Sequence, residues 1–174
     1  MIEQLRQFVS RYRRSGVIVD TNILLLYFIG RFAPDQISRF KRTDTFDLDD
    51  FTFLKLLLSQ FDRLLTTPAI LAEVSNLSAQ LGEPLRTTYF ESFRNEITLL
   101  DERYIRSDDA ASGGCFIRLG LTDSGIHLLA RQNLVLTVDL QLYLFLLSEN
   151  LDAINFNHLR PLGWALLAEN MSGD

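Results

Sequence analysis

Two aspartates in this chain each follow a short apolar stretch. Asp20 comes directly after residues 17–19, and Asp139 comes directly after residues 134–138. Runs of β-branched and aliphatic residues of this length are typical of buried strands in a parallel sheet. Because the carboxyl ends of parallel strands share one edge of the sheet, we expect both carboxylates to lie at that edge. An aspartate in this position also commonly caps the helix that follows, and this alternative stays open for each residue alone.

Two further acids are expected on apolar helix faces. Glu73 lies on a helix predicted at 68–80, and Asp123 on one predicted at 123–131, each three or four residues from apolar neighbours. A charge in such a place is costly to desolvate unless it is paired. An arginine near Glu73, and the dipole of its own helix for Asp123, would satisfy each acid separately. Together, the four acids are explained more simply by a shared cation, and oxygen-only ligation favours Mg²⁺ or Mn²⁺ over zinc.

The elements that would position these acids alternate along the chain. Thr67 and Pro68 predict a helix start, with a capping side chain followed by a proline in the first turn. The alternation predicts parallel βαβ crossovers and an α/β fold, a three-layer α/β/α sandwich around a small, mainly parallel sheet. Strands are predicted at 17–19, 64–66, 97–100, 134–138 and 152–156, and helices at 2–14, 23–29, 51–61, 68–80, 85–96, 123–131, 140–149 and 161–171.

The chain length of 174 residues suits a single domain. Residues 1–15 are expected to form a helical extension before the first strand. Residues 30–50 are the most polar and least periodic part of the chain, which predicts an insertion or a mobile loop. Asp44, Asp47 and Asp49 lack the glycine and the final glutamate of a calcium loop, so capping of the following helix is the better interpretation.

Composition narrows the classes of protein. The net charge of −5 gives no general attraction to nucleic acid, so any such contact must be local. One cysteine and two histidines argue against an intramolecular disulfide and a closed zinc site. The amino terminus does not resemble a signal peptide, and no apolar run is long enough to cross a bilayer, so we expect a cytoplasmic protein.

The sequence lacks residues that several other classes of α/β protein require. A phosphatase of the haloacid dehalogenase type needs a second aspartate two positions after the first, where this chain has Asn22. A response-regulator receiver needs a late lysine, and no lysine follows Lys55. Gly-rich dinucleotide loops and Walker A motifs are also missing from the sequence.

Four short segments, in this order, resemble the PIN-domain nucleases, including the toxin subunits of bacterial type II toxin–antitoxin pairs. The segments are 19–22, 67–74, 119–126 and 136–139. The resemblance implies an endoribonuclease that depends on Mg²⁺ or Mn²⁺. It also implies a metal site formed by four catalytic acids and supported by two polar residues. The acids are Asp20, Glu73, Asp123 and Asp139, and the supporting residues are Asn22 and Thr137.

Other polar residues are candidates for a supporting role at the metal site or for contacts with RNA. Ser124 could hydrogen-bond a ligand carboxylate or lie exposed in a first helical turn. Basic residues near the extension and in segment 30–50 are candidates for contacts with RNA phosphates, with a solvated basic face as the alternative. These residues are Arg13, Arg14, Arg39, Lys41 and Arg42.

The chain also departs from the short toxin pattern. Residues 1–15 and 30–50 are additional, and Gln141 stands where some relatives carry a further acid. The resemblance implies RNA as substrate, and an antitoxin protein and a second copy of the chain as candidate partners. A housekeeping RNA-processing nuclease and a catalytically silent, PIN-like protein-binding module remain as alternatives.

Overall fold

The computed structural model of the protein describes residues 2–171, and the side chains of residues 2–163. An open sheet of five parallel strands lies at its centre, in the order β3-β2-β1-β4-β5. The middle strand is the buried Val-Ile-Val run that follows Gly16, as predicted. The strands are β1 (Val17–Val19), β2 (Leu64–Thr66), β3 (Asp101–Glu102), β4 (Leu134–Thr137) and β5 (Ala153–Asn155).

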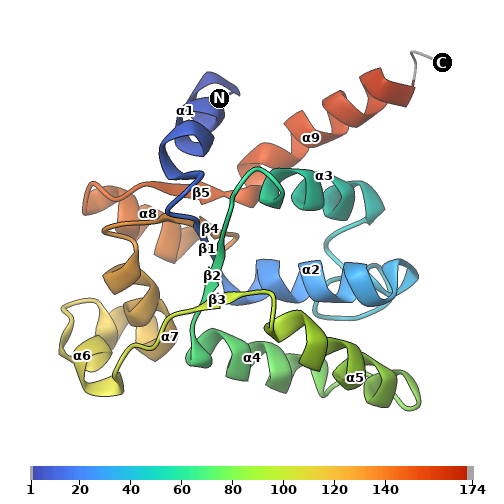
Figure 1. The fold of residues 1–174 in the computed structure, drawn as a ribbon, viewed down its shortest axis with the longest axis horizontal. Coiled ribbons are helices and arrows are strands. Elements are labelled where there is room, and N and C mark those ends of the chain that lie inside the picture. Colours follow the sequence, from blue (N-terminus) through green and yellow to red (C-terminus); the bar gives the residue numbers. More distant parts are fainter. Residues whose placement is uncertain (1, 172–174) are drawn as a thin grey trace.

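Helices cover both faces of this sheet, which confirms the predicted three-layer α/β/α sandwich. Figure 1 shows α6, α7 and α8 on one side of the strands and α2 and α3 on the other. Among the described residues, no helix is long and apolar enough to cross a membrane. The helices are α1 (Ile2–Tyr12), α2 (Thr21–Phe32), the 3₁₀ helix η1 (Pro34–Gln36), α3 (Leu48–Leu58), α4 (Pro68–Ser78), α5 (Leu85–Ile97), α6 (Ser107–Ser112), α7 (Phe116–Leu129), α8 (Leu140–Ser148) and α9 (Phe156–Met171).

Helix starts follow the capping chemistry of the sequence. The hydroxyl of Thr67 accepts a hydrogen bond from the backbone N–H of Ile70 at 3.2 Å, so α4 begins as predicted. Asp47 and Asp50 form a reciprocal capping box at the start of α3. These aspartates therefore have a structural role in starting a helix, as the capping interpretation predicts.

Three predicted boundaries are wrong. Residues 97–100 form the end of α5 and a turn rather than a strand, and the third strand is β3 at 101–102. Helix α7 begins at Phe116 rather than at residue 123, but Gly120 (φ 84°) interrupts its helical geometry, and the predicted helix corresponds to the part of α7 that follows this kink. Thr122 lies in the first turn after this kink. Helix α9 begins at Phe156 rather than at residue 161.

The two additional segments are attached to the core. The extension 1–15 contains α1, whose last turn is tied to the start of β5. There, Asp152 accepts hydrogen bonds from Arg11 at 2.6 Å and Tyr12 at 2.8 Å. In segment 30–50, the side chains of Phe40 and Phe46 are buried in the core. Their burial anchors this segment between α2 and α3.

Candidate active site

The strand order reverses between two of the strands, and we refer to the region beyond their carboxyl ends, where the four acids lie, as the crevice. The chain moves from β1 outward to β2 and β3, and then returns to the other side of β1 to form β4 and β5. The order therefore reverses between β1 and β4, and open α/β sheets bind ligands beyond the carboxyl ends of the strands at such a point. Asp20 and Asp139 follow these two strands, and the backbone N–H of Asp20 donates to the carbonyl of Leu136 at 3.0 Å. The predicted convergence of the two strand ends is present.

Asp20 is almost fully buried, with 4 % of its surface exposed. It is the N-cap of α2, and its Oδ1 accepts the backbone N–H of Thr21 at 2.6 Å. Its Oδ2 accepts the hydroxyl of Thr137 at 2.6 Å. Burial raises the pKa of Asp20 to about 6, against these two hydrogen bonds, and the charges of Asp139 and Glu73 add to the rise. Asp20 therefore caps α2 and also places a carboxylate at the crevice.

Asp139 lies at the exposed rim of the crevice as the N-cap of α8. Its Oδ1 accepts the backbone N–H groups of Gln141 at 2.6 Å and Leu142 at 3.0 Å. Its own backbone N–H donates to the hydroxyl of Thr137 at 2.9 Å. Among the described residues, Oδ2 of Asp139 has no hydrogen-bond partner, so this oxygen is available to a ligand.

Glu73 joins the crevice from α4. Its Oε2 accepts the hydroxyl of Thr21 at 2.8 Å, and its Oε1 accepts the hydroxyl of Thr122. The prediction that Glu73 faces the packed side of its helix is wrong, because the residue is exposed. Its neighbours Ile70 and Val74 are buried, so Glu73 lies beside the packed face and reaches over the starts of α2 and α7.

Asp123 is half-buried on α7, and its pKa is raised to about 7. Burial is the main cause, and the charges of Asp20, Asp139 and Glu73 raise it further. Within the described part of the chain, the Asp123 carboxylate accepts no hydrogen bond, and no basic side chain is paired with any of the four acids. The four carboxylates are therefore close enough to repel one another without a cationic partner from residues 2–163.

This donor set fits a hard divalent cation. Carboxylate oxygens are the ligands that Mg²⁺ and Mn²⁺ prefer, and mutual repulsion is what such an ion relieves. In the described residues, no three carboxylate, imidazole or thiol groups are close enough together to hold one ion in this side-chain arrangement. The hydroxyls of Thr21 and Thr122 hold both oxygens of Glu73 instead.

The supporting residues separate into two groups. Thr137 contacts both strand-end acids, as described above. Asn22 is exposed in the first turn of α2. Ser124 is buried, but its hydroxyl lies 3.4 Å from the thiol of Cys115 instead of contacting a site carboxylate. That thiol is also 3.6 Å from Nδ1 of His127.

Two threonines of the site were not predicted from the sequence. Thr21 and Thr122 each lie next to a candidate acid, Asp20 and Asp123 respectively. A hydroxyl beside a candidate ligand is the only signal the sequence offers. The partner of both hydroxyls, Glu73, is about fifty residues away in the chain.

The predicted phosphate contacts do not gather at the acids. Arg13 and Arg14 precede β1, so they lie at the amino edge of the parallel sheet, and Arg13 pairs with Asp62 there at 3.4 Å. Residues 39–42 follow α2, whose twelve residues carry the chain about 18 Å from Asp20. Arg42 donates to Gln80, beyond the far end of α4, at 3.0 Å. These positions are inconsistent with direct contacts between the basic residues and the scissile phosphate. The residues concerned are Arg13, Arg14, Arg39, Lys41 and Arg42.

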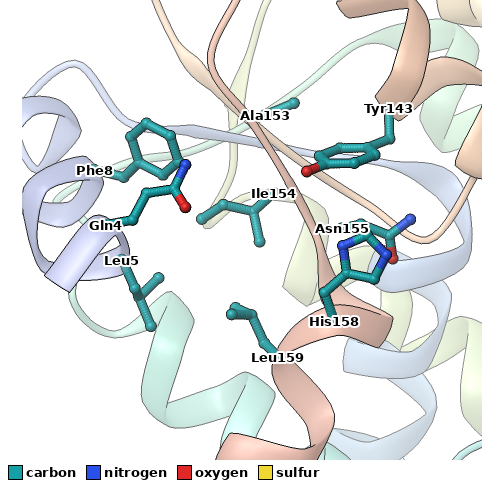
Figure 2. A pocket seen from close by; sticks show the side chains of 9 residues that line it. All are labelled: Gln4, Leu5, Phe8, Tyr143, Ala153, Ile154, Asn155, His158 and Leu159. Atoms are coloured by element: carbon teal, nitrogen blue, oxygen red, sulfur yellow. The ribbon is translucent and has the colours of Figure 1, made fainter. Parts of the chain in front are cut away.

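A separate hollow lies between α1, β5, α8 and α9 (Figure 2). The polar ends of Tyr143, Asn155 and His158 gather on one side, and the aliphatic side chains of Leu5 and Ile154 lie on the other. Its volume is about 70 Å³, far below the roughly 300–1,000 Å³ of a typical small-molecule site. The acids do not line this hollow, so we do not assign the activity to it.

Comparison of the chain with protein-family models, with curated proteins and with solved structures finds no match. The functional argument therefore depends on the residues of the crevice themselves.

Proposed function

We propose that the protein is a divalent-metal-dependent endoribonuclease that hydrolyses RNA phosphodiester bonds. Asp20, Glu73, Asp123 and Asp139 would hold Mg²⁺ or Mn²⁺. The observation that supports this most strongly is the geometry at the carboxyl ends of β1 and β4, where the Thr137 hydroxyl contacts both the Asp20 carboxylate and the backbone N–H of Asp139. Asp123 lies half-buried near these acids with a raised pKa, and shifted pKa values of this kind are also typical of functional sites. The place of the acids at the reversal of strand order supports the same conclusion.

Each residue of the crevice would have a separate role in holding the ion. When bound, a divalent ion supplies an activated water nucleophile and offsets charge on the phosphate oxygens. Thr137 and the N–H of Thr21 hold the Asp20 carboxylate in one orientation, which pre-organises a ligand in the floor of the crevice. Asp139 offers its free Oδ2 at the rim. Glu73 and Asp123 complete the set from α4 and α7, and hydrolysis by water needs no nucleophilic side chain.

Cleavage of end-labelled single-stranded RNA with Mn²⁺ tests the proposal. The wild-type protein is expected to cut internally, and Asp20→Asn to lose at least about 100-fold in rate, the scale of a several-kcal/mol electrostatic contribution. Asp35→Asn is the matched control, because Asp35 is an exposed acid paired with Arg39 on the surface. If the folded wild-type protein cuts neither RNA nor DNA with metal present, the proposal is wrong.

The toxin role is a finer proposal, and one surface feature favours it. Leu140, Leu144 and Leu147 of α8 are 55 %, 52 % and 42 % exposed, at spacings of four and three residues. They form an apolar stripe that begins directly after Asp139. A protein partner that covered this stripe would also lie beside the crevice, as an antitoxin must. A small DNA-binding protein encoded next to this gene, forming a complex on co-expression, would support the role, and an isolated gene would weaken it.

A further inference from the structure

We infer that a pocket beside the four acids binds one unstacked base of single-stranded RNA, with Tyr104 as the stacking residue. The inference depends on the proposed function, because it gives that site a substrate-recognition element. The pocket lies beyond the carboxyl ends of β2 and β3 and has a volume of about 240 Å³. Its lining comes from the starts of α4 and α6, from the segment after β3, and from α7.

The pocket and the acids share two helices, α4 and α7, and Ala69 at the pocket lies one helical turn before Glu73 on α4. The pocket wall also includes Leu121 and Gly125 of α7, which share one side of that helix, while Asp123 between them lies toward another side. It also includes Pro68 and Ala69 in the first turn of α4, the helix that carries Glu73. A strand of RNA with its phosphate at the acids therefore has a neighbouring base within reach of this pocket.

The lining is suited to a neutral planar ring. Among the described residues that line it there is no charged side chain, so it offers nothing to a phosphate. Tyr104 is 78 % exposed, so its ring is accessible to a stacking partner. The volume lies below the roughly 300–1,000 Å³ of sites that enclose a larger small molecule, which favours a single ring system. Bases of single-stranded RNA stack on exposed aromatic rings of this kind.

Two arginines beside the pocket are candidates for contacts with the backbone that such a base would bring, in a segment that also holds Asp101, Glu102, Asp108 and Asp109. Arg103 and Arg106 flank residues 104–105, and both side chains are largely exposed, at 44 % and 66 %. Arg103 donates to Asp101 at 2.8 Å, an exposed pair weak enough for a phosphate to compete. Arg106 donates to both oxygens of Asp108, at 2.9 and 2.7 Å, and is held more firmly. Along the chain, the aromatic Tyr104 lies between the basic residues Arg103 and Arg106. This order favours single-stranded nucleic acid over a duplex, whose bases are already stacked.

Binding of a fluorescent ten-nucleotide single-stranded RNA tests the inference, measured by anisotropy in Mg²⁺. Every protein carries Asp20→Asn so that the RNA is not consumed. We expect Tyr104→Ala to weaken binding about 5- to 150-fold, the effect of one stacked base, and Tyr104→Phe to stay within about threefold. Ile117→Ala is the control, because Ile117 is 93 % exposed on α7 but does not line the pocket. A duplex of the same sequence should bind without dependence on Tyr104.

The outcomes separate this inference from the nuclease proposal. If Tyr104→Ala binds like its parent, or if none of the proteins binds the RNA, the base pocket is wrong, whatever the cleavage assay gives. If wild-type protein fails to cleave but binding depends on Tyr104, the nuclease proposal is wrong and the base pocket is supported.

Discussion

The hydroxyl of Thr137 donates a 2.6 Å hydrogen bond to Oδ2 of Asp20, and the Thr137 hydroxyl oxygen accepts the backbone N–H of Asp139 at 2.9 Å. One buried side chain at the end of β4 therefore fixes the acid that follows β1 and the backbone of the acid that follows β4. Because hydrogen bonding to a carboxylate stabilises its charged form, this contact limits the cost of burying Asp20.

Replacing Thr137 should weaken cation binding without removing a ligand. Thr137→Val keeps the shape of the side chain and deletes the hydroxyl, so we expect a 10- to 100-fold loss of Mn²⁺ affinity, the usual effect of a residue that orients a metal ligand. Thr137→Ser keeps the hydroxyl and should stay close to wild type. Isothermal titration calorimetry measures both, and equal affinities for the valine and serine variants would refute this role.

Removing the charge of Asp20 should stabilise the metal-free protein. Asp20→Asn relieves the burial and repulsion that raise the pKa of Asp20 to about 6, and at pH 7 the gain is roughly 1–3 kcal/mol in the free energy of unfolding. Urea denaturation in a chelating buffer measures it, with Asp35→Asn as a surface control that should change stability by less than about 1 kcal/mol. A clear loss of stability in Asp20→Asn would mean that its charge is structurally paired.

The same charge predicts a direction for the pH dependence. The pKa of an aspartate is about 3.8 in the unfolded chain. In the folded protein, burial raises the pKa of Asp20 to about 6 and that of Asp123 to about 7. Between about pH 4 and 7 the folded protein holds protons that the unfolded chain has lost, so these groups lower stability as the pH rises. The advantage of Asp20→Asn over wild type should therefore be small at pH 4 and grow toward pH 6–7. Denaturation curves of both proteins across this range show whether the difference instead shrinks.

A buried ion pair outside the site should matter more for stability than any surface pair. Arg160 donates to both oxygens of Asp50 at 2.8 and 2.6 Å, and the Asp50 side chain is fully buried. Arg160→Met leaves that carboxylate without its main counter-charge, which should cost about 3–5 kcal/mol of unfolding free energy. Arg39→Met, which breaks the exposed pair with Asp35, should cost less than about 1 kcal/mol. Equal effects in urea denaturation would contradict this account.

The strand-end acids could be predicted from the sequence because the signal is local. Apolar stretches ending in Asp20 and Asp139 indicate buried strands, and a parallel sheet brings their ends to one edge. The sheet order, which makes β1 and β4 neighbours, depends on long-range pairing that the local pattern does not contain. Periodicity placed Glu73 on the packed face of its helix, but it cannot show that a side chain at the edge of that face reaches across to Thr21 and Thr122.

The basic residues show a second limit of local patterns. Charge alone makes Arg13 and Arg14 candidates for RNA phosphate contacts, but a residue that precedes a strand of a parallel sheet lies at the edge opposite its carboxyl end. Tyr104 gave no signal, because β3 has only two residues and one aromatic in a loop is unremarkable in a sequence. Its exposure and its neighbours in the pocket become visible only in the folded chain.

Mn²⁺ titration of the purified protein tests the central claim most directly, namely that four carboxylates share a cation. Calorimetry at pH 7.5 should show saturable binding to wild-type protein, a loss of at least 10-fold in affinity for Asp20→Asn, Glu73→Gln, Asp123→Asn and Asp139→Asn, and no change for Asp35→Asn. No binding to wild-type protein, or binding that is indifferent to all four site variants, would contradict the claim.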